Sequence, residues 1–296
     1  MEQIKEISID DKNYPKFLKQ IKDSPKVLYC KGEIKPDEIC FAVVGTRRYS
    51  SYGKQLALEI AGELAETGLT IVSGLAPGID TFVHQAAVER KKRTIAVLGT
   101  GIDERSIYPK SNINLARRIL ETGGCLISEY PPGTSGTQFT FPQRNRIISG
   151  LSLGILVIEA KQKSGALITA NWAKKQGRKI FAVPGSIYSS NSKGCHYLIK
   201  QGAKLAENSQ DILKELNLVG LIKETEKLAG ETPEENLTLN ALKEGALYID
   251  KIIEKTKLSV AVVASTLAIL EIKGKVRNLG TNIYARCHNL NGPGQK

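Results

Sequence analysis

Residues 71–80 read I-V-S-G-L-A-P-G-I-D, and this stretch decides the fold. Its β-branched start is typical of a buried strand, Pro77-Gly78 favours a tight turn, and the apolar spacing from Ile79 onward predicts a helix. A strand that passes through glycines into a helix N-terminus presents backbone N–H groups at the positive end of the helix dipole, which attracts anions. A turn without a ligand is the alternative. The residues that we predict around a phosphate here are Ser73, Gly74, Ala76 and Gly78.

The same alternation of strand and helix patterns extends on both sides of this stretch. Short β-branched runs predict strands at 41–44, 69–72, 94–98, 125–128, 153–159 and 179–183. Helical spacing lies between them, at 52–67, 79–90, 111–122, 144–151 and 166–176. Nearly continuous apolar strands that alternate with helices predict an α/β fold with a doubly wound, mostly parallel sheet. In such a sheet, ligands bind beyond the carboxyl ends of the strands.

Changes in composition divide the chain into segments. Residues 1–35 predict a lead, with a small helix and an extended segment, that packs on a main domain of residues 36–217. Residues 218–236 are rich in charge and poor in apolar side chains, which predicts a linker. Residues 237–288 predict three helices and a β-ribbon, the pattern of a winged-helix domain, and residues 289–296 predict a frayed tail. Within the winged helix we expect one helix through Leu239, Leu242 and Leu247, a second capped by Asp250, a third capped by Ser259, and pairing of 275–278 with 282–286.

The chain has 296 residues, of which 41% are hydrophobic and 24% charged, and its formal net charge is +12. Such a basic chain favours a polyanionic partner, above all nucleic acid.

We recognise no signal peptide and no apolar run long enough to span a membrane. The five cysteines are dispersed without a C-x-x-C pair, which predicts reduced thiols, a cytoplasmic location and no metal site. Neither G-x-G-x-x-G nor G-x-x-x-x-G-K-[ST] is present, and we predict no cofactor.

Residues 139–150 read F-T-F-P-Q-R-N-R-I-I-S-G and combine aromatic with basic side chains. Bases of a single strand stack on aromatic rings while arginines contact the phosphates. We assign Phe141 to base stacking, Asn145 to polar positioning, and Arg144 and Arg146 to phosphate. The alternative is that the phenylalanines are core and that one arginine pairs with a glutamate, Glu129 or Glu159. For Phe139 we expect the core.

Two other strand ends carry features of an anion site. Arg47 follows a strand directly, where its guanidinium is placed to fork onto a phosphate, although a solvated surface arginine is an equal alternative. Gly165 opens a helix after another strand, so that its N–H and those that follow form a second anion site. An ordinary N-cap at Ser164 is the competing explanation, and both can hold.

The third helix of the winged-helix domain has an unusual composition for DNA reading. Residues 259–270 read S-V-A-V-V-A-S-T-L-A-I-L and contain no lysine, arginine, asparagine or glutamine. A recognition helix brings such side chains to the base edges in the major groove. We therefore expect this domain to pack against a protein or to contact DNA weakly, without reading a sequence.

At these residues the sequence resembles the DprA family of DNA-processing proteins, also called Smf. The matching motifs are G-T-R-x-x-S-x-Y-G at 45–53, S-G-L-A-x-G-I-D at 73–80, V-L-G-x-G-I-D at 97–103, S-E-Y-P at 128–131, F-P-x-R-N-R-I-I-S-G-L-S at 141–152, E-A-x-x-x-S-G-A-L-I-T-A at 159–170 and G-R-x-x-F-A-V-P-G at 177–185. The lead and the winged helix are also similar to that family. Gln138 stands where members often carry a lysine, and His196 where they usually carry an asparagine.

The resemblance implies an extended Rossmann-like domain that binds single-stranded DNA and forms a homodimer. It further implies protection of incoming strands and loading of the RecA recombinase in natural transformation, with displacement of single-strand-binding protein. Carried over by motif, Arg47 and the turn at 73–78 would cradle phosphates, and Phe141, Arg144, Asn145 and Arg146 would line the same groove.

Two other classes of function are weighed against this one. Nucleoside-monophosphate phosphoribohydrolases of the lysine-decarboxylase-like group have similar sheets, with P-G-G-x-G-T-x-x-E and a catalytic glutamate. The comparable turn here is K-S-G-A-L-I-T-A-N, without that glutamate, so we predict no enzyme and no catalytic residue. The third class, a sequence-specific regulator, is disfavoured by the composition of residues 259–270.

Overall fold

The computed structural model describes residues 3–218, 230–242 and 245–286. The chain divides into two compact units, Met1–Leu221 and Ile222–Lys296. The predicted tail at 289–296 and much of the predicted linker lie outside the described residues, as do the first two residues of the predicted lead.

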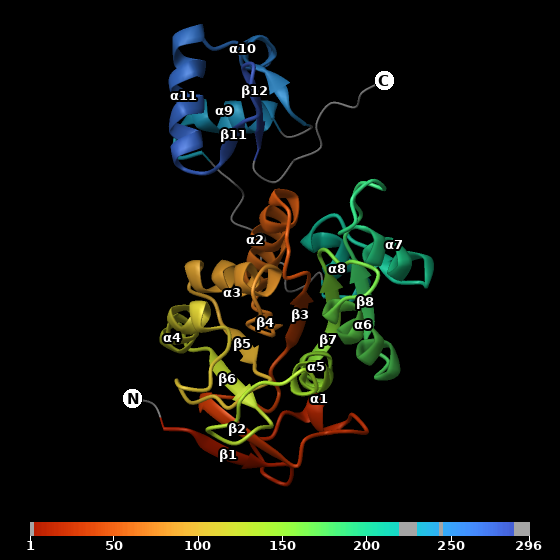
Figure 1. Ribbon diagram of the computed structural model, residues 1–296. Coiled ribbons are helices and arrows are strands. Elements are labelled where there is room, and N and C mark those ends of the chain that lie inside the picture. The colour runs from red at the N-terminus through yellow and green to blue at the C-terminus, as the bar shows by residue number, and fades with distance from the viewer. Residues whose placement is uncertain (1–2, 219–229, 243–244, 287–296) are drawn as a thin grey trace. The chain divides into compact units, whose positions relative to one another are not determined.

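Unit 1 is built on a nine-stranded sheet with the order β1-β2-β6-β5-β4-β3-β7-β8-β9 (Figure 1). From β6 to β9 all neighbours are parallel, and β1 and β2 add an antiparallel edge. The strands are β1 Lys5–Ser8, β2 Val27–Gly32, β3 Cys40–Val44, β4 Thr70–Ser73, β5 Thr94–Val97, β6 Cys125–Ser128, β7 Ser152–Val157, β8 Lys179–Ala182 and β9 Lys204–Leu205.

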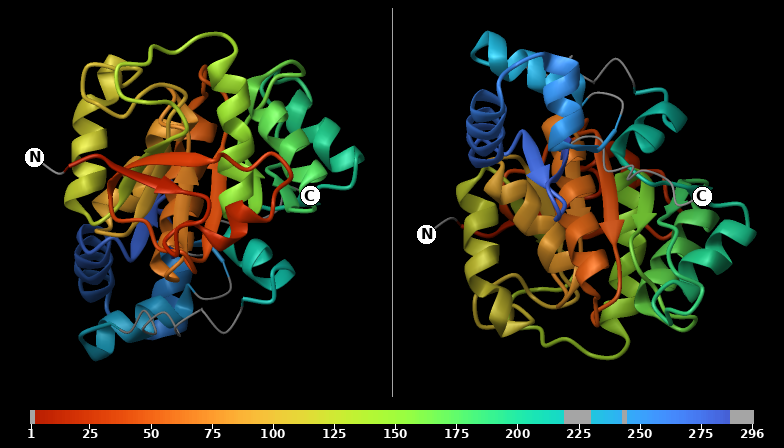
Figure 2. Two further views of the ribbon diagram at one scale, coloured as in Figure 1. Left: turned by 90° about the horizontal axis from the view of Figure 1, so that it is seen from below. Right: turned by 90° about the horizontal axis from the view of Figure 1, so that it is seen from above.

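Helices cover both faces of this sheet (Figure 2). They are α1 Lys16–Lys19, α2 Ser51–Glu66, α3 Ile79–Glu89, α4 Ile113–Glu121, α5 Thr140–Leu151, α6 Gly165–Lys175, α7 Lys193–Lys200 and α8 Ser209–Glu215, with a short 3-10 helix at Lys110–Asn112. On one face α1, α5, α6 and α7 pack on the sheet, and on the other α3 and α4 pack on it beside α2. The predicted doubly wound, mostly parallel α/β fold is therefore confirmed.

The strands β3 and β4 show why this sequence forms a buried parallel sheet. All five residues of β3 and all four of β4 are buried, so both faces of each strand are covered by apolar contacts. The side chain of Ser73, at the end of β4, donates to the carbonyl of Val43 at 2.7 Å, which satisfies its polar atom inside the core.

Three features of unit 1 differ from the expectations. The segment before residue 35 does more than pack on the domain, because β2 pairs with β6 and extends the sheet. Helix α5 begins at Thr140 rather than at Arg144, although Pro142 lies in its first turn, where proline is tolerated. The elements α7, β9 and α8 were not anticipated, because each is only two to eight residues long.

Unit 2 contains three helices and a three-stranded sheet with the order β10-β12-β11. Its elements are α9 Pro233–Ala241, β10 Leu247–Tyr248, α10 Ile249–Thr256, α11 Val260–Ile272, β11 Val276–Asn278 and β12 Ile283–Arg286. Leu239, Ile252, Leu267 and Val276 lie together in its core. This arrangement is a winged helix.

Within unit 2, two local predictions are confirmed and three are wrong. Ser259 caps α11 by accepting from the N–H of Val262, and β11 pairs with β12. Leu247 lies in a strand rather than in the first helix, and Asp250 lies inside α10, whose N-cap is Tyr248. Residues 233–236, predicted as linker, lie in α9, because Thr232 caps that helix and Pro233 fits its first position.

Candidate nucleic-acid interface

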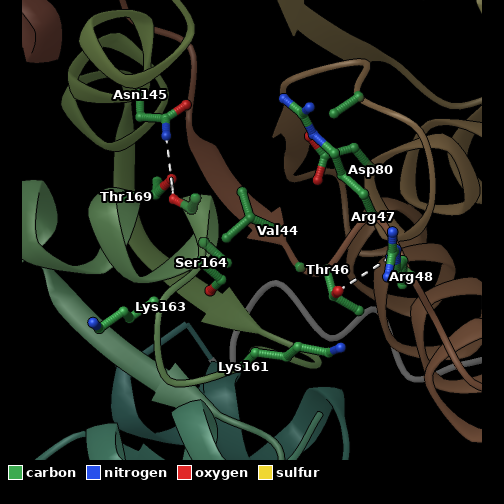
Figure 3. Close-up of a pocket in the computed structure, with 14 residues that line it drawn as sticks. Val44, Thr46, Arg47, Arg48, Asp80, Asn145, Lys161, Lys163, Ser164 and Thr169 are labelled. Carbon is green, nitrogen blue, oxygen red and sulfur yellow. Dashed lines mark hydrogen bonds between the residues drawn. The ribbon is translucent and has the colours of Figure 1, made fainter. Parts of the chain in front are cut away.

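A basic pocket of unit 1 lies where the strand order reverses. β3 pairs with β4 on one side and with β7 on the other, so the loops that follow β3 and β7 diverge. A pocket of about 450 Å³ opens between these loops (Figure 3). Such a crevice at the carboxyl ends of parallel strands is where open α/β sheets bind their ligands.

Four basic side chains line this pocket. Arg47 and Arg48 come from the loop after β3, and Lys161 and Lys163 from the loop after β7. None of the four forms an ion pair with a described residue. Figure 3 shows the two arginines on one side of the pocket and Lys163 with Ser164 on the other. One carboxylate, that of Asp80, also lines the pocket, so basic side chains outnumber acidic ones there by four to one.

The N-terminus of α6 forms part of the pocket wall. Ser164 is its N-cap residue but makes no side-chain cap hydrogen bond. The Ser164 hydroxyl is buried and has no hydrogen-bond partner among the described residues. It lies beside Gly165 and Ala166, whose N–H groups stand at the positive end of the helix. A free hydroxyl, a helix N-terminus and basic side chains together fit an anion such as a phosphate. This agrees with the predicted role of Gly165, which stays a prediction.

The turn between β4 and α3 already holds an anion, and that anion is part of the chain. The carboxylate of Asp80 accepts a hydrogen bond of 3.1 Å from the N–H of Gly74, and it also accepts from the N–H groups of Gly45 and Ala76. Burial raises the pKa of Asp80, while Arg144 and these N–H groups act in the opposite direction. The contacts favour the structural alternative for this turn.

The predicted residues of the turn have different surroundings. Ser73 is fully buried and bonded to Val43, and the carbonyl of Gly74 accepts from Arg144 at 2.7 Å. Gly78 has φ +89, and a Cβ there would lie 2.5 Å from the carbonyl oxygen of Thr46, so the turn requires glycine. Ala76 lines the pocket. The phosphate role of these residues stays a prediction, and Ala76 alone of the four faces the pocket.

Arg47 and Phe141 meet at the edge of the pocket. The guanidinium carbon of Arg47 lies 5.7 Å from the centre of the Phe141 ring, a cation–π distance. Tyr108 is an aromatic neighbour of that ring, at 5.5 Å between ring centres, and Tyr108 is half exposed. The structure thus joins the arginine and the aromatic ring that the sequence placed in one groove.

Arg144 is buried, with 4% of its surface exposed, and is not among the residues that line the pocket. Its guanidinium donates to the carbonyls of Gly74 and Val97, and burial lowers its pKa to about 10, partly offset by the charge of Asp80. Neighbouring Asn145 donates from Nδ2 to the carbonyl of Gly165 at 3.2 Å and lines the pocket. These contacts favour a supporting role for Arg144 and the predicted positioning role for Asn145, and both assignments stay predictions.

Arg146 pairs with a carboxylate instead of facing the pocket. Two of its nitrogens donate to the two oxygens of Glu129, at 2.6 and 2.7 Å, and its Nε donates to the carbonyl of Asp23. Only 6% of Arg146 is exposed. This is the ion pair that was the alternative to a phosphate contact, and the geometry favours it.

Phe139 is the clear error among the aromatic predictions, because 72% of its surface is exposed. It stands one residue before α5, where the chain has not yet reached the core.

The sequence reasoning also missed Arg48, Lys161 and Lys163. Their signal was their position directly after predicted strands, which puts basic side chains on the ligand-binding edge.

Other kinds of site have little support in the described residues. No group of three His, Cys, Asp or Glu side chains there could hold a metal. Cys30, Cys40, Cys125 and Cys195 are buried free thiols, and Cys287 lies outside the described residues. None of the described helices is long and apolar enough to cross a membrane.

The fold and the pocket define a Rossmann-like α/β protein with a basic crevice at its switch point and a winged-helix unit. Family models match both parts: DNA recombination-mediator protein A over residues 5–217, and the DprA winged helix domain over residues 210–280. The chain belongs to the DNA recombination-mediator protein A family, known as DprA or Smf.

Individual relatives agree with this assignment. DNA processing protein DprA of Bacillus subtilis is 45% identical over 217 residues, covering 72% of this chain and 71% of the relative. Protein Smf of Escherichia coli is 44% identical over 211 residues, and the match spans 71% of this chain and 56% of that protein.

Two solved structures extend the comparison. DprA of Streptococcus pneumoniae has a TM-score of 0.66 at 44% identity and covers 72% of this chain and 74% of its own. DprA of Helicobacter pylori, whose structure is described in terms of its single-stranded DNA binding mode, has a TM-score of 0.64 at 31% identity. That match covers 73% of this chain and 98% of the Helicobacter chain.

Proposed function

We propose that this chain binds single-stranded DNA in the switch-point pocket and acts on that DNA as a recombination mediator. The observation that carries the proposal is the pocket itself. It combines the N-terminus of α6 and the unpartnered hydroxyl of Ser164 with four basic side chains that have no described ion-pair partner. These are the features of a phosphate site.

The surroundings of the pocket favour a strand over a small anion. The pocket continues at Arg47 to the ring of Phe141, which packs against the half-exposed Tyr108. A site that places aromatic rings beside phosphate-binding groups accommodates a base next to its backbone, and such stacking tolerates any sequence. Phe139 adds a further exposed ring at the start of α5. The structure of the Helicobacter relative, described for its single-stranded DNA binding, supports this ligand.

The finer parts of the proposal come from family membership. We infer that the chain takes part in DNA processing during transformation, protects incoming single strands and loads RecA on them in place of single-strand-binding protein. We place this action in the cytoplasm, by a homodimer and without catalysis of its own. The name of the Bacillus relative, DNA processing protein DprA, and that of the family, DNA recombination-mediator protein A, support this reading.

Fluorescence anisotropy of a labelled oligo-dT in a salt series tests the binding step. We expect tight binding that weakens steeply with salt, and a loss of affinity of about 10-fold or more in Arg47→Ala with a shallower salt slope. The matched control is Arg118→Ala, which removes an exposed arginine from α4. Equal affinity of Arg47→Ala and Arg118→Ala would contradict the proposed position of the strand.

The loading step needs its own assay. We expect the chain to restore RecA filament formation on single strands that are covered by single-strand-binding protein, and Arg47→Ala to restore it less. Failure of the wild-type chain in this assay, with DNA binding intact, would leave the binding function and remove the loading function.

A further inference from the structure

A second pocket of unit 1 lies away from the strand ends. It has a volume of about 520 Å³ and is formed by residues 20–23, which follow α1, and by the last turns of α6. Helix α6 joins the two pockets, because Gly165 at its start lines the first and Lys175 at its end lines the second. At a rise of about 1.5 Å per residue, the two ends are about 15 Å apart. The second pocket is therefore a separate site on the same helix.

The lining of this second pocket combines an aromatic face with positive charge. Trp172, the single tryptophan of the chain, contributes its indole, and the ammonium of Lys175 lies 4.9 Å from the ring centre. Lys22 and Arg178 add two more cations, against one carboxylate, that of Asp23. Neither Lys22 nor Asp23 is in an ion pair with a described residue. This lining suits a ligand with a flat ring and a negative group.

Two residues that line the pocket each carry a buried polar atom without a partner among the described residues. Oε1 of Gln176 and Nε of Arg178 are buried, and neither has a hydrogen-bond partner among the described residues. Buried polar atoms are almost always paired, so this acceptor and this donor are available to a ligand that enters the pocket. Every nucleobase carries a donor next to an acceptor on one edge, which is the complementary pattern.

The walls of the pocket are held in place by other hydrogen bonds. Arg146 donates to the carbonyl of Asp23, and its own carbonyl accepts from Nε2 of Gln176 at 3.0 Å. Arg178 donates to the carbonyls of Phe17 and Gly150. Because the side chains are fixed before a ligand arrives, binding costs less conformational entropy.

We propose that this pocket is a nucleotide site, in which a base lies against Trp172 and meets Gln176 and Arg178, while Lys22 and Lys175 receive its phosphate. The nucleotide has two sources with the same chemistry. It is either part of a strand that also occupies the switch-point pocket, or a free mononucleotide.

Because Trp172 is the single tryptophan, its emission reports this pocket alone. Titration of the full chain with dAMP is expected to change that emission in a saturable way. Lys175→Gln is expected to weaken the apparent Kd about fivefold, since it removes a cation from both ring and phosphate. The matched control, Lys174→Gln, makes the same charge change at the neighbouring residue, which does not line the pocket, and should stay within about twofold.

Two results would overturn the proposal. One is a tryptophan emission that does not respond to millimolar dAMP. The other is an equal effect of Lys175→Gln and Lys174→Gln. Neither depends on the switch-point pocket, because the anisotropy of Arg47→Ala tests that site separately.

An oligonucleotide distinguishes the two sources. Titration with (dA)12 is repeated on wild type and on Arg47→Ala. If one strand occupies both pockets, Arg47→Ala weakens the emission change caused by (dA)12 and leaves that caused by dAMP intact. If the site takes free nucleotides, both responses are unaffected by Arg47→Ala. Either result supports the site and identifies its source.

Discussion

The carboxylate of Asp80 accepts a hydrogen bond of 3.1 Å from the N–H of Gly74. With two more bonds from neighbouring N–H groups, this carboxylate takes the place that an external phosphate would need in the turn after β4. The glycine-rich turn is thus organised around an internal anion, and the site that we propose for DNA phosphate lies at the N-terminus of α6, after the strand two places along the sheet.

Replacing Asp80 by asparagine tests this role. The substitution removes the charge that faces buried Arg144 and turns an amide towards backbone N–H donors. We expect the free energy of unfolding to fall by about 3 kcal/mol, measured by urea denaturation. The control Asp10→Asn, at an exposed position, should change it by less than about 0.5 kcal/mol. Similar values for the two variants would contradict the role of Asp80.

The sheet could be predicted from the sequence because its signals are local. Runs such as Cys40–Val44 are apolar throughout, and a strand buried on both faces has that pattern wherever its neighbours come from. The antiparallel edge was not foreseen, because β1 exposes three of its four residues and is held by pairing with β2, a contact that periodicity does not show.

The candidate site was predictable only at the level of segments. Because Arg47 and Gly165 follow predicted strands, the sequence assigned both to the ligand-binding edge of the sheet, where they line the pocket. The sequence position of a charged residue does not show whether it forms an ion pair. Glu129 and Arg146, for example, are 17 residues apart and meet only in the folded chain. The sequence also does not show that the carboxylate of Asp80 accepts a hydrogen bond from the N–H of Gly74 in the turn where we had predicted a phosphate.

Gly78 and Gly123 both have a positive φ, but only at Gly78 would an added Cβ also clash with neighbouring atoms. Gly78→Ala places a Cβ at φ +89 and 2.5 Å from the carbonyl oxygen of Thr46, whereas Gly123→Ala meets φ +75 with no atom within 4 Å. We expect Gly123→Ala to cost about 1 kcal/mol of unfolding free energy and Gly78→Ala distinctly more. Because the clash also involves Arg47, Gly78→Ala should lower DNA affinity as well. Equal unfolding free energies of the two variants would contradict this prediction. They would show that the loop around Gly78 moves to accommodate the added Cβ.

Arg146→Ala distinguishes an ion pair from a phosphate contact. Loss of the guanidinium leaves the carboxylate of Glu129 mostly buried without its partner, so we expect stability to fall by about 3 kcal/mol. The salt dependence of oligo-dT binding should keep its slope under conditions where the variant is folded. A phosphate contact would instead reduce that slope by about one unit. Such a reduction, measured by anisotropy, would restore the original assignment.

His84 gives the fold a defined response to acid. It is fully buried, its Nδ1 lies 2.8 Å from Oγ1 of Thr94, and burial lowers its pKa from 6.5 to about 3, with a further contribution from Arg144. The imidazole of His84 therefore takes up a proton below pH 6.5 in the unfolded chain, but only below about pH 3 in the folded chain. Stability is complete above the first value and is lost progressively as the pH falls towards the second.

Between pH 7 and pH 5 this linkage should lower the free energy of unfolding by about 2 kcal/mol. The comparison is with His84→Asn, in which an amide can still reach Thr94 but does not titrate. Urea denaturation of both proteins over the pH series gives the difference in slope, which is insensitive to the constant cost of the smaller side chain. We expect wild type to lose about 2 kcal/mol more than the variant, and parallel slopes would show that His84 is protonated in the folded state.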